Sequence, residues 1–141
     1  MKPDVSQLLQ MTGMQVPGLA AHTSYAQGSA TMITGLLMMA AVEVDRGVEN
    51  RVTDNAEMRA LFASLAPGVK DVALKAEVEA AAKTKDTSLR ISALNQDNAG
   101  LRKVLIKLQT YVEDAGDREA QKQVWAVLKA SAERRILSIG G

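Results

Sequence analysis

The most constraining feature of this sequence is a long stretch without charge. From Val5 through Val42 the chain contains no Asp, Glu, Lys or Arg, although charged residues make up 23% of the sequence. The stretch is not uniformly apolar, because Thr, Ser, Gln and Gly are interspersed among its Leu, Met and Ala residues. This composition favours a helix packed closely against other helices over one surrounded by water. We therefore expect other helices, of the same chain or of a second copy, to cover this stretch.

The uncharged stretch does not match a signal peptide or a membrane span. Its densest apolar run, Gly35–Val42 with Ile33 just before it, is much shorter than the roughly 20 residues that a spanning helix needs. A secretory signal needs a basic start and an uninterrupted apolar core, whereas Pro17-Gly18 interrupts this one. We therefore expect no membrane insertion.

Length and charge predict one ordinary domain. A chain of 141 residues is long enough to bury its own core, so we expect a single helical-bundle domain over 1–141. Within it, 1–22 is expected to form an N-terminal arm with a short helix. The net charge is +1 without the one-signed excess of a nucleic-acid-binding protein, so no nucleic-acid partner is expected. The sequence has no cysteine, which is compatible with a reducing compartment, and a cytoplasmic location is expected.

Glycine and proline mark the expected ends of the first helix. Asp4 or Ser6 is a suitable cap for a short helix over Val5–Thr12 that stops at Gly13. The Pro-Gly pair within residues 15–18 then predicts a turn or an extended link.

A long second helix is expected over residues 23–66, with Thr23 or Ser24 as its cap. Gly47 predicts a kink or a pause within it. The pair Asp54 and Glu57 resembles a capping box, which favours a break there. The alternative is one uninterrupted helix.

Three further helices complete the expected all-α fold, an up-down bundle of about four to five helices. Pro67-Gly68 predicts the end of the long helix. The later helices are expected over 69–83, 88–113 and 118–137. No segment shows the alternating, β-branched pattern of a strand.

A short internal repeat links two of the expected helices. Residues 54–65 and 97–108 align with an offset of 43 positions (97 minus 54), and Asp, Asn, Ala, Arg and the final Leu are identical in both. Duplication of a helical hairpin would produce this repeat. Two helices that independently obey the same packing rule would produce it as well.

The second copy of the repeat carries a heptad pattern. One row contains Leu94, Leu101 and Leu108, and the companion row contains Ile91, Asn98, Leu105 and Val112. Leu in one row with a single Asn in the other is typical of a two-stranded parallel coiled coil. The offset puts Asn55 in the same row as Asn98, and a buried Asn needs a polar partner. We expect the two to meet, within one chain or between two; the alternative is that each faces solvent or bonds to its own backbone.

The sequence offers no catalytic or metal-binding constellation. His22 is the only histidine, whereas a di-iron bundle needs paired Glu-x-x-His motifs and a zinc site needs several His or Cys ligands. The glycines do not follow the spacing of a phosphate-binding loop. We expect no metal, no cofactor and no enzymatic activity.

The favoured hypothesis is a non-enzymatic interaction protein, a homo-oligomer and specifically a homodimer through its N-terminal helices, with a possible protein partner. Small residues four apart share one face of a helix and allow close approach of a second backbone. The interface candidates are Gly28, Thr31, Gly35, Met38, Met39, Asn55 and Asn98. The alternative is a bundle that binds a small hydrophobic ligand or lipid in a groove lined by Met and Leu, since Met forms adaptable apolar surfaces.

The stretch Leu94–Asn98 resembles a motif of flagellar-type export chaperones, which are also small helical bundles. The resemblance covers only these five positions, and the uncharged first third of the chain does not match that family. It implies a small adaptor as a second alternative function. No family is assigned from it and no binding residues are carried over.

Overall fold

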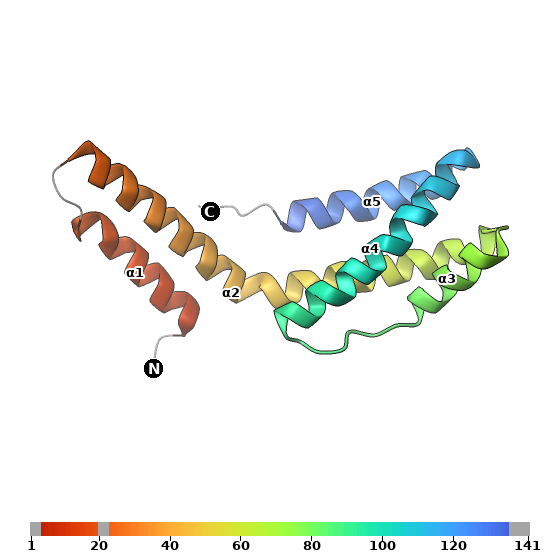
Figure 1. Ribbon diagram of the computed structural model, residues 1–141, viewed down its shortest axis with the longest axis horizontal. Coiled ribbons are helices and arrows are strands. Elements are labelled where there is room, and N and C mark those ends of the chain that lie inside the picture. The colour runs from red at the N-terminus through yellow and green to blue at the C-terminus, as the bar shows by residue number, and fades with distance from the viewer. Residues whose placement is uncertain (1–3, 20–22, 136–141) are drawn as a thin grey trace. The chain divides into compact units, whose positions relative to one another are not determined.

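The computed structural model describes residues 4–19 and 23–135 of the chain. These residues form five α-helices and one 3-10 turn, with no strand among them (Figure 1). The elements are α1 (Val5–Leu19), α2 (Ser24–Leu65), η1 (Ala66–Gly68), α3 (Val72–Ala82), α4 (Ile91–Asp114) and α5 (Arg118–Arg134). The all-α prediction is confirmed, including the long second helix, which spans 45 residues when η1 is counted with it.

The described residues divide into two compact units. The hairpin unit contains the described residues up to Gly47, and the bundle unit contains those from Val48 to Arg135. Helix α2 contributes its first half to the hairpin unit and its second half to the bundle unit. The described residues of the predicted arm, 1–22, therefore belong to a larger unit. A single domain over 1–141 stays a prediction.

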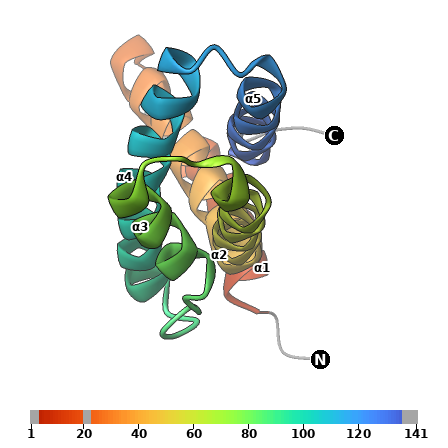
Figure 2. The same ribbon diagram turned by 90° about the vertical axis from the view of Figure 1, so that its right-hand side faces the viewer.

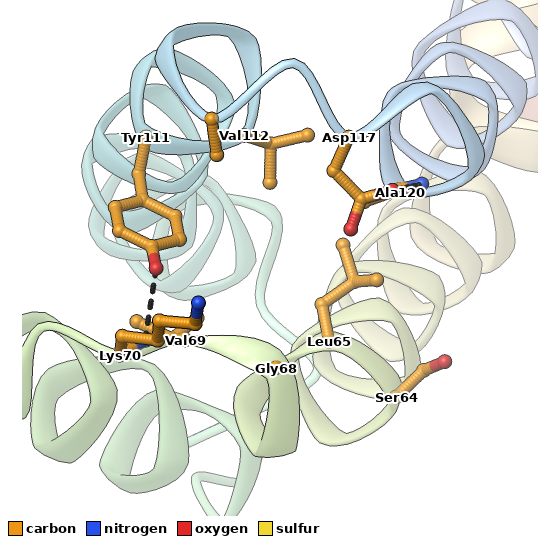
Figure 3. A pocket seen from close by; sticks show the side chains of 10 residues that line it. Ser64, Leu65, Gly68, Val69, Lys70, Tyr111, Val112, Asp117 and Ala120 are labelled. Carbon is orange, nitrogen blue, oxygen red and sulfur yellow. Dashed lines mark hydrogen bonds between the residues drawn. The ribbon is translucent and has the colours of Figure 1, made fainter.

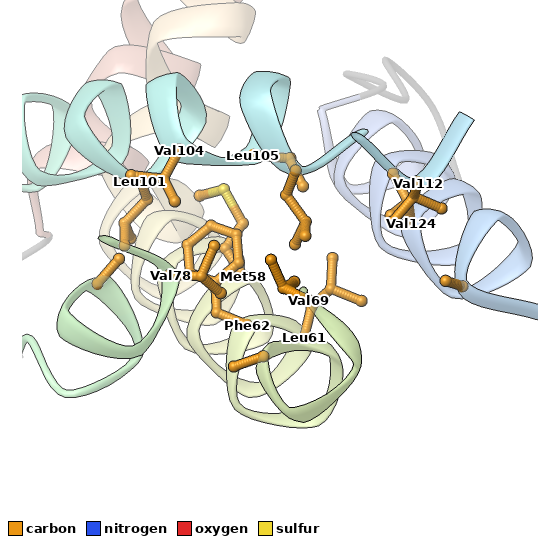
Figure 4. Packing of buried hydrophobic residues seen from close by; sticks show 14 residues of the cluster. Met58, Leu61, Phe62, Val69, Val78, Leu101, Val104, Leu105, Val112 and Val124 are labelled. Carbon is orange, nitrogen blue, oxygen red and sulfur yellow. The ribbon is translucent and has the colours of Figure 1, made fainter. Parts of the chain in front are cut away.

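The bundle unit has an apolar core between α2, α3, α4 and α5 (Figures 2 and 4). Its largest fully buried apolar side chains are Phe62, Leu94, Leu108, Val78 and Val124. Each helix contributes apolar residues at spacings of three and four, so that one face of each turns inward. The helical-bundle prediction is confirmed for this unit.

Helices α2 and α4 run in the same direction within the bundle unit. The Nε atom of Arg51 donates a hydrogen bond to Oδ1 of Asn95 at 2.7 Å, and Asn98 bonds to Asn55 one turn further along both helices. The predicted heptad rows of α4 are buried except for Ile91, which is partly buried. The heptad rows of α4, which predict a coiled coil, thus pack against helices of the same chain.

The expected end of the first helix at Gly13 is wrong. Helix α1 continues to Leu19 and contains Pro17. Proline has no N–H to donate to the carbonyl four residues earlier, which is that of Gly13. The hydroxyl of Thr34 lies 3.2 Å from this carbonyl oxygen and donates to it. The neighbouring helix therefore supplies a donor that the proline removes, and the helix persists.

The expected pause at Gly47 is also wrong, whereas a kink there stays a prediction. Helix α2 is continuous across this residue, and Asp54 lies inside the helix instead of capping one. The Asp54 carboxylate accepts hydrogen bonds from α5, from Ser131 Oγ at 2.9 Å and from Arg134 Nε at 2.9 Å. A carboxylate with partners on another helix does not need the N–H groups of a helix start. Gly47 nevertheless marks the division between the two units.

Aspartates and one threonine cap the starts of helices, and those at Asp4 and Thr23 were expected. Asp4 accepts from Gln7 N while Gln7 Oε1 accepts from Asp4 N, which is a reciprocal cap of α1. Thr23 accepts from Ala26 N at the start of α2. Asp71 and Asp117 cap α3 and α5, so α3 begins three residues later than expected and α5 begins at Arg118 as expected. The expected end of the last helix, at 137, lies outside the described residues.

Candidate interaction surface

Helices α1 and α2 of the hairpin unit are joined by hydroxyl groups and a close approach. Ser6 Oγ donates to the carbonyl of Ala41 at 3.1 Å. The Thr34 hydroxyl lies within hydrogen-bond distance of two carbonyls, those of Gly13 and of Ala30 in its own helix, and shares its proton between them. A Cβ at Gly13 would lie 3.2 Å from the methyl group of Met38. These contacts hold the two helices together without a charged group.

The hairpin unit leaves most of its large apolar side chains exposed. Among the described residues, eleven of the fifteen exposed large hydrophobic side chains belong to this unit. They are Val5, Leu8, Met11, Met14, Leu19, Tyr25, Met32, Ile33, Leu36, Met39 and Val44. Helices of the same chain therefore cover the uncharged stretch only in part, and cover by a second copy stays a prediction. Many exposed apolar side chains on one folded unit make it a candidate interaction site.

The two sides of the hairpin unit differ in chemistry. A helix turns by about 100° per residue, so the hydrogen-bonded positions and the apolar flank of each helix point to different sides. The hydroxyl contacts lie between the two helices, and on one side of them Gln10 of α1 and Gln27 and Thr31 of α2 are exposed. The opposite side carries the apolar flank of each helix, including Leu19 and Ile33.

An open apolar groove lies on this second side. Its volume is about 390 Å³, and it is formed where the end of α1 meets the start of α2. The lining residues are Val16, Leu19, Tyr25, Ala26, Ser29, Ala30 and Ile33. Leu19 and Tyr25 are 84% and 85% exposed, more than any other large apolar side chain in the described part of the chain. No local sequence pattern predicts this groove, because its position depends on α1 continuing past Gly13.

The structure places the predicted N-terminal interface residues on two faces of α2. Gly28 and Thr31 are exposed, and a Cβ at Gly28 or at the half-buried Gly35 would meet nothing within 4 Å. Met39 is exposed, whereas Met38 is half-buried and reaches toward α1. Only Met38 therefore packs within the hairpin, and the others face outward.

The two predicted asparagines meet inside one chain. Asn98 Nδ2 donates to Asn55 Oδ1 at 2.9 Å, and both side chains are buried. The amide of Asn55 also donates to Asp86 Oδ1 at 2.9 Å, while Asn98 Oδ1 accepts from Arg102 Nε at 2.8 Å. The predicted pairing is confirmed in its intrachain form. These amides fix the register of α2 against α4 and are already satisfied within the bundle unit.

A polar network continues from this pair to α5. Arg102 reaches Ser131 Oγ, which donates to the buried carboxylate of Asp54. Arg134 bridges Asp54 and Glu57 with its guanidinium. The hydrogen bond to Glu57 raises the pKa of Arg134, and Asp54 adds to this effect while burial opposes it. No described buried side chain in the network lacks a hydrogen-bond partner.

The described residues of the bundle unit line a cavity at each of two places. One, of about 330 Å³, lies between the η1 turn and the α4–α5 connection, where Tyr111 Oη accepts from Lys70 N at 2.9 Å (Figure 3). The other, of about 390 Å³, lies between α3 and α4 and is rimmed by Arg59, Glu77 and Asp97. Each of these three side chains already has a partner within the unit. These three charged groups at the rim of the second cavity are therefore held by contacts of the bundle unit itself.

The described residues contain no group of three or more His, Asp or Glu side chains placed to hold a metal ion. His22, the only histidine, lies outside the described residues. By length and composition, α2 with η1 could cross a membrane, and only 11% of its most apolar window is buried. The predicted absence of membrane insertion therefore stays a prediction.

The exposed apolar side of the hairpin unit is the candidate functional surface. It combines missing charge, large exposed side chains and a groove. Compared with known proteins, the chain matches no family model, no curated protein and no solved structure.

Proposed function

We propose that this protein is a non-enzymatic interaction protein whose hairpin unit associates with the hairpin unit of a second copy. The single observation that carries the proposal is the exposure of eleven large apolar side chains on a unit whose uncharged stretch extends from Val5 through Val42. The bundle unit has its own buried core. Association of the hairpin units would bring two such bundles together.

The exposed apolar area of the hairpin unit is comparable with that of a homodimer interface. Full burial of a Val, Leu, Ile or Met side chain is worth about 1.5–3 kcal/mol at about 25 cal/mol per Å², which corresponds to roughly 60–120 Å² per side chain. With the exposed fractions of the eleven side chains, the hairpin unit presents on the order of 400–800 Å² of apolar side-chain surface over all its sides. A standard interface needs about 800 Å² from each partner, of which about 60% is apolar. Two uncharged surfaces also approach each other without like-charge repulsion.

The exposed glutamines of α1 favour a protein partner over a bilayer. Gln7, Gln10 and Gln15 of α1 are all exposed. In hydrocarbon each of these amides would lose its hydrogen bonds to water, at a cost of about 2–7 kcal/mol per amide. In addition, the 15 residues of α1 extend for only about 22 Å at 1.5 Å per residue, less than the roughly 30 Å of a hydrocarbon core.

Sedimentation velocity of the full chain tests the proposal. We expect a homodimer at micromolar concentration. The double variant Ile33→Gln with Leu36→Gln is expected to dissociate at least tenfold more readily. Ile106→Gln is the matched control, because Ile106 of α4 is 64% exposed and Leu36 is 60% exposed, but Ile106 belongs to the bundle unit. A wild-type chain that remains monomeric at tens of micromolar would refute the proposal.

Insertion of the hairpin unit into a membrane is a second candidate function. The observation that favours it is the length and low burial of the apolar part of α2. Flotation with neutral phosphatidylcholine vesicles separates the two candidates. Under the self-association proposal the chain stays in the dense fraction as a dimer. Recovery of the chain with the vesicles would support membrane insertion instead.

Two further functions also remain predictions. The open groove of the hairpin unit has a volume comparable with small-molecule sites of 300–1,000 Å³, which fits the hydrophobic-ligand alternative. Native mass spectrometry of the purified chain tests it, because a bound ligand adds mass to the protein. The export-adaptor alternative rests on the five-residue resemblance alone, and a cytoplasmic location likewise stays a prediction.

A further inference from the structure

The groove of the hairpin unit has projecting apolar groups directly beside it. Leu19 and Tyr25 line the groove and are at the same time the two most exposed large apolar side chains among the described residues. The lining also includes the smaller side chains of Ala26, Ser29 and Ala30. One surface patch thus contains both a hollow and the groups of a size to fill it.

A patch with this composition is complementary to itself under two-fold symmetry. In an isologous dimer, residue i of one copy contacts residue j of the other, and residue j contacts residue i in return. Leu19 and Tyr25 of each copy can then enter the groove of the other. No charge lies on the groove lining, so the patch does not select a partner of opposite charge.

The small-residue face is the competing interface. Thr31 lies two residues after Ser29, and two residues correspond to about 200° of helix rotation, so the two side chains point to opposite sides of α2. Ser29 lines the groove, whereas Thr31 is exposed and its hydroxyl donates to the carbonyl of Gln27 in its own helix. Exposed Gln27 adds a polar group there, which an apolar interface would have to dehydrate.

We propose that the dimer interface is the groove side of the hairpin unit, where the Leu19 and Tyr25 side chains of each copy fill the groove between α1 and α2 of the other. This inference rests on the proposed self-association, and it selects one face of the hairpin for it. It moves the interface away from Gly28, Thr31 and Gly35, the stripe of small residues that the sequence favours.

Cysteine cross-linking of the full chain tests the choice of face, since the natural sequence has no cysteine and each introduced thiol is unique. Ser29→Cys and Thr31→Cys are a matched pair on one helix. A short bismaleimide is expected to convert Ser29→Cys into a covalent dimer at least tenfold more efficiently than Thr31→Cys. Preferential cross-linking through Thr31→Cys would overturn the inference and support the small-residue stripe.

A second pair of variants gives an independent measurement. Leu19→Ser is expected to raise the dimer dissociation constant at least tenfold in sedimentation equilibrium. Met14 is also on α1 and is 65% exposed, but it does not line the groove. Met14→Ser is therefore expected to change the dissociation constant by less than about twofold. Equal effects of both variants would overturn the choice of face while the self-association stands. A monomeric wild type in the same experiment would instead overturn the proposed function itself.

Discussion

The two units of this chain solve the packing of helices in opposite ways. The bundle unit buries large apolar side chains such as Phe62 and Leu108 and satisfies its buried polar groups with partners in the same unit. The hairpin unit exposes its large apolar side chains and joins its helices through Ser6, Thr34 and a close approach at Gly13. Helix α2 takes part in both arrangements.

This difference shows that one continuous helix can contribute to a buried core along one half and to an exposed apolar surface along the other. After Gly47 the helix carries charged residues and turns an apolar face into a core within its own chain. Before Gly47 its apolar residues have too few neighbours in the described chain to be covered. The hairpin unit is therefore expected to gain much of its stability from association, whereas the bundle unit is expected to be stable without it.

The largest expected effect comes from opening the core of the bundle unit. Phe62 is fully buried, so Phe62→Ala is expected to lower the free energy of unfolding by about 3–5 kcal/mol. Leu36→Ala, on the exposed face of the hairpin unit, is expected to change unfolding of the bundle by less than about 0.5 kcal/mol. Urea denaturation followed by the fluorescence of Trp125 in α5 measures both. Equal losses would show that the two units unfold as one.

Removing the guanidinium of Arg134, which binds Asp54 and Glu57, should have the next largest effect on the stability of the bundle unit. Arg134→Ala leaves the buried carboxylate of Asp54 with fewer partners and is expected to cost about 1.5–3 kcal/mol. Lys122→Ala is the control, because its pair with Glu119 is exposed and is worth about 0–1 kcal/mol. Denaturant unfolding of each variant gives the comparison, and equal losses would contradict it.

The contribution of Arg134 is expected to be independent of pH over the neutral and mildly alkaline range. Its pKa is raised above the ordinary value by the hydrogen bond to Glu57. A base with a raised folded-state pKa contributes its full stability below its unfolded pKa, and this is lost only as the pH rises through the folded value. The difference between wild type and Arg134→Ala should therefore be constant from about pH 7 to about pH 10. Unfolding curves across this range check it.

A smaller effect is expected from the asparagine pair of the bundle unit. Asn55→Leu or Asn98→Leu alone leaves the partner amide incompletely bonded and is expected to cost about 1–3 kcal/mol. The double variant is expected to lose less than the sum of the two, since no unpaired amide remains between α2 and α4. Strict additivity in this double-mutant cycle would mean that the amides do not depend on each other.

The smallest expected effect compares two glycines of the hairpin unit. Gly28→Ala meets nothing within 4 Å and is expected to stabilise α2 by about 0.5–1 kcal/mol. At Gly13 a new Cβ would lie 3.2 Å from Met38 and 3.4 Å from the Cβ of Leu37, so this gain should be offset. Thermal unfolding followed by circular dichroism ranks the two variants. A larger gain at Gly13 would contradict the close approach of α1 and α2.

Much of the bundle unit could be predicted from the sequence because its pattern is periodic. The heptad rows around Leu101 and the offset between Asn55 and Asn98 depend on helix geometry alone, and both are seen in the structure. Whether the asparagines meet within one chain or between two could not be derived. That choice depends on α3, which returns the chain so that α2 and α4 run parallel.

The hairpin unit was less predictable because its contacts override local signals. Pro17 and Gly13 are ordinary signals for the end of a helix, yet α1 continues through both. The role of Asp54 was missed for a similar reason, since its partners Ser131 and Arg134 lie about eighty positions away in the sequence. Such partners leave no local pattern. The groove followed from the same unexpected extension of α1.

The link from Pro17 to Thr34 has a consequence for how this chain can vary. A proline deprives its helix of one donor, and here a hydroxyl from the neighbouring helix compensates at the Gly13 carbonyl. Changing Thr34 to Val would leave that oxygen without its substitute donor, whereas the same change would be milder in a chain with Ala at position 17. Substitutions at positions 17 and 34 are therefore expected to occur together among descendants of this sequence, because the hydroxyl is needed only where the proline is present.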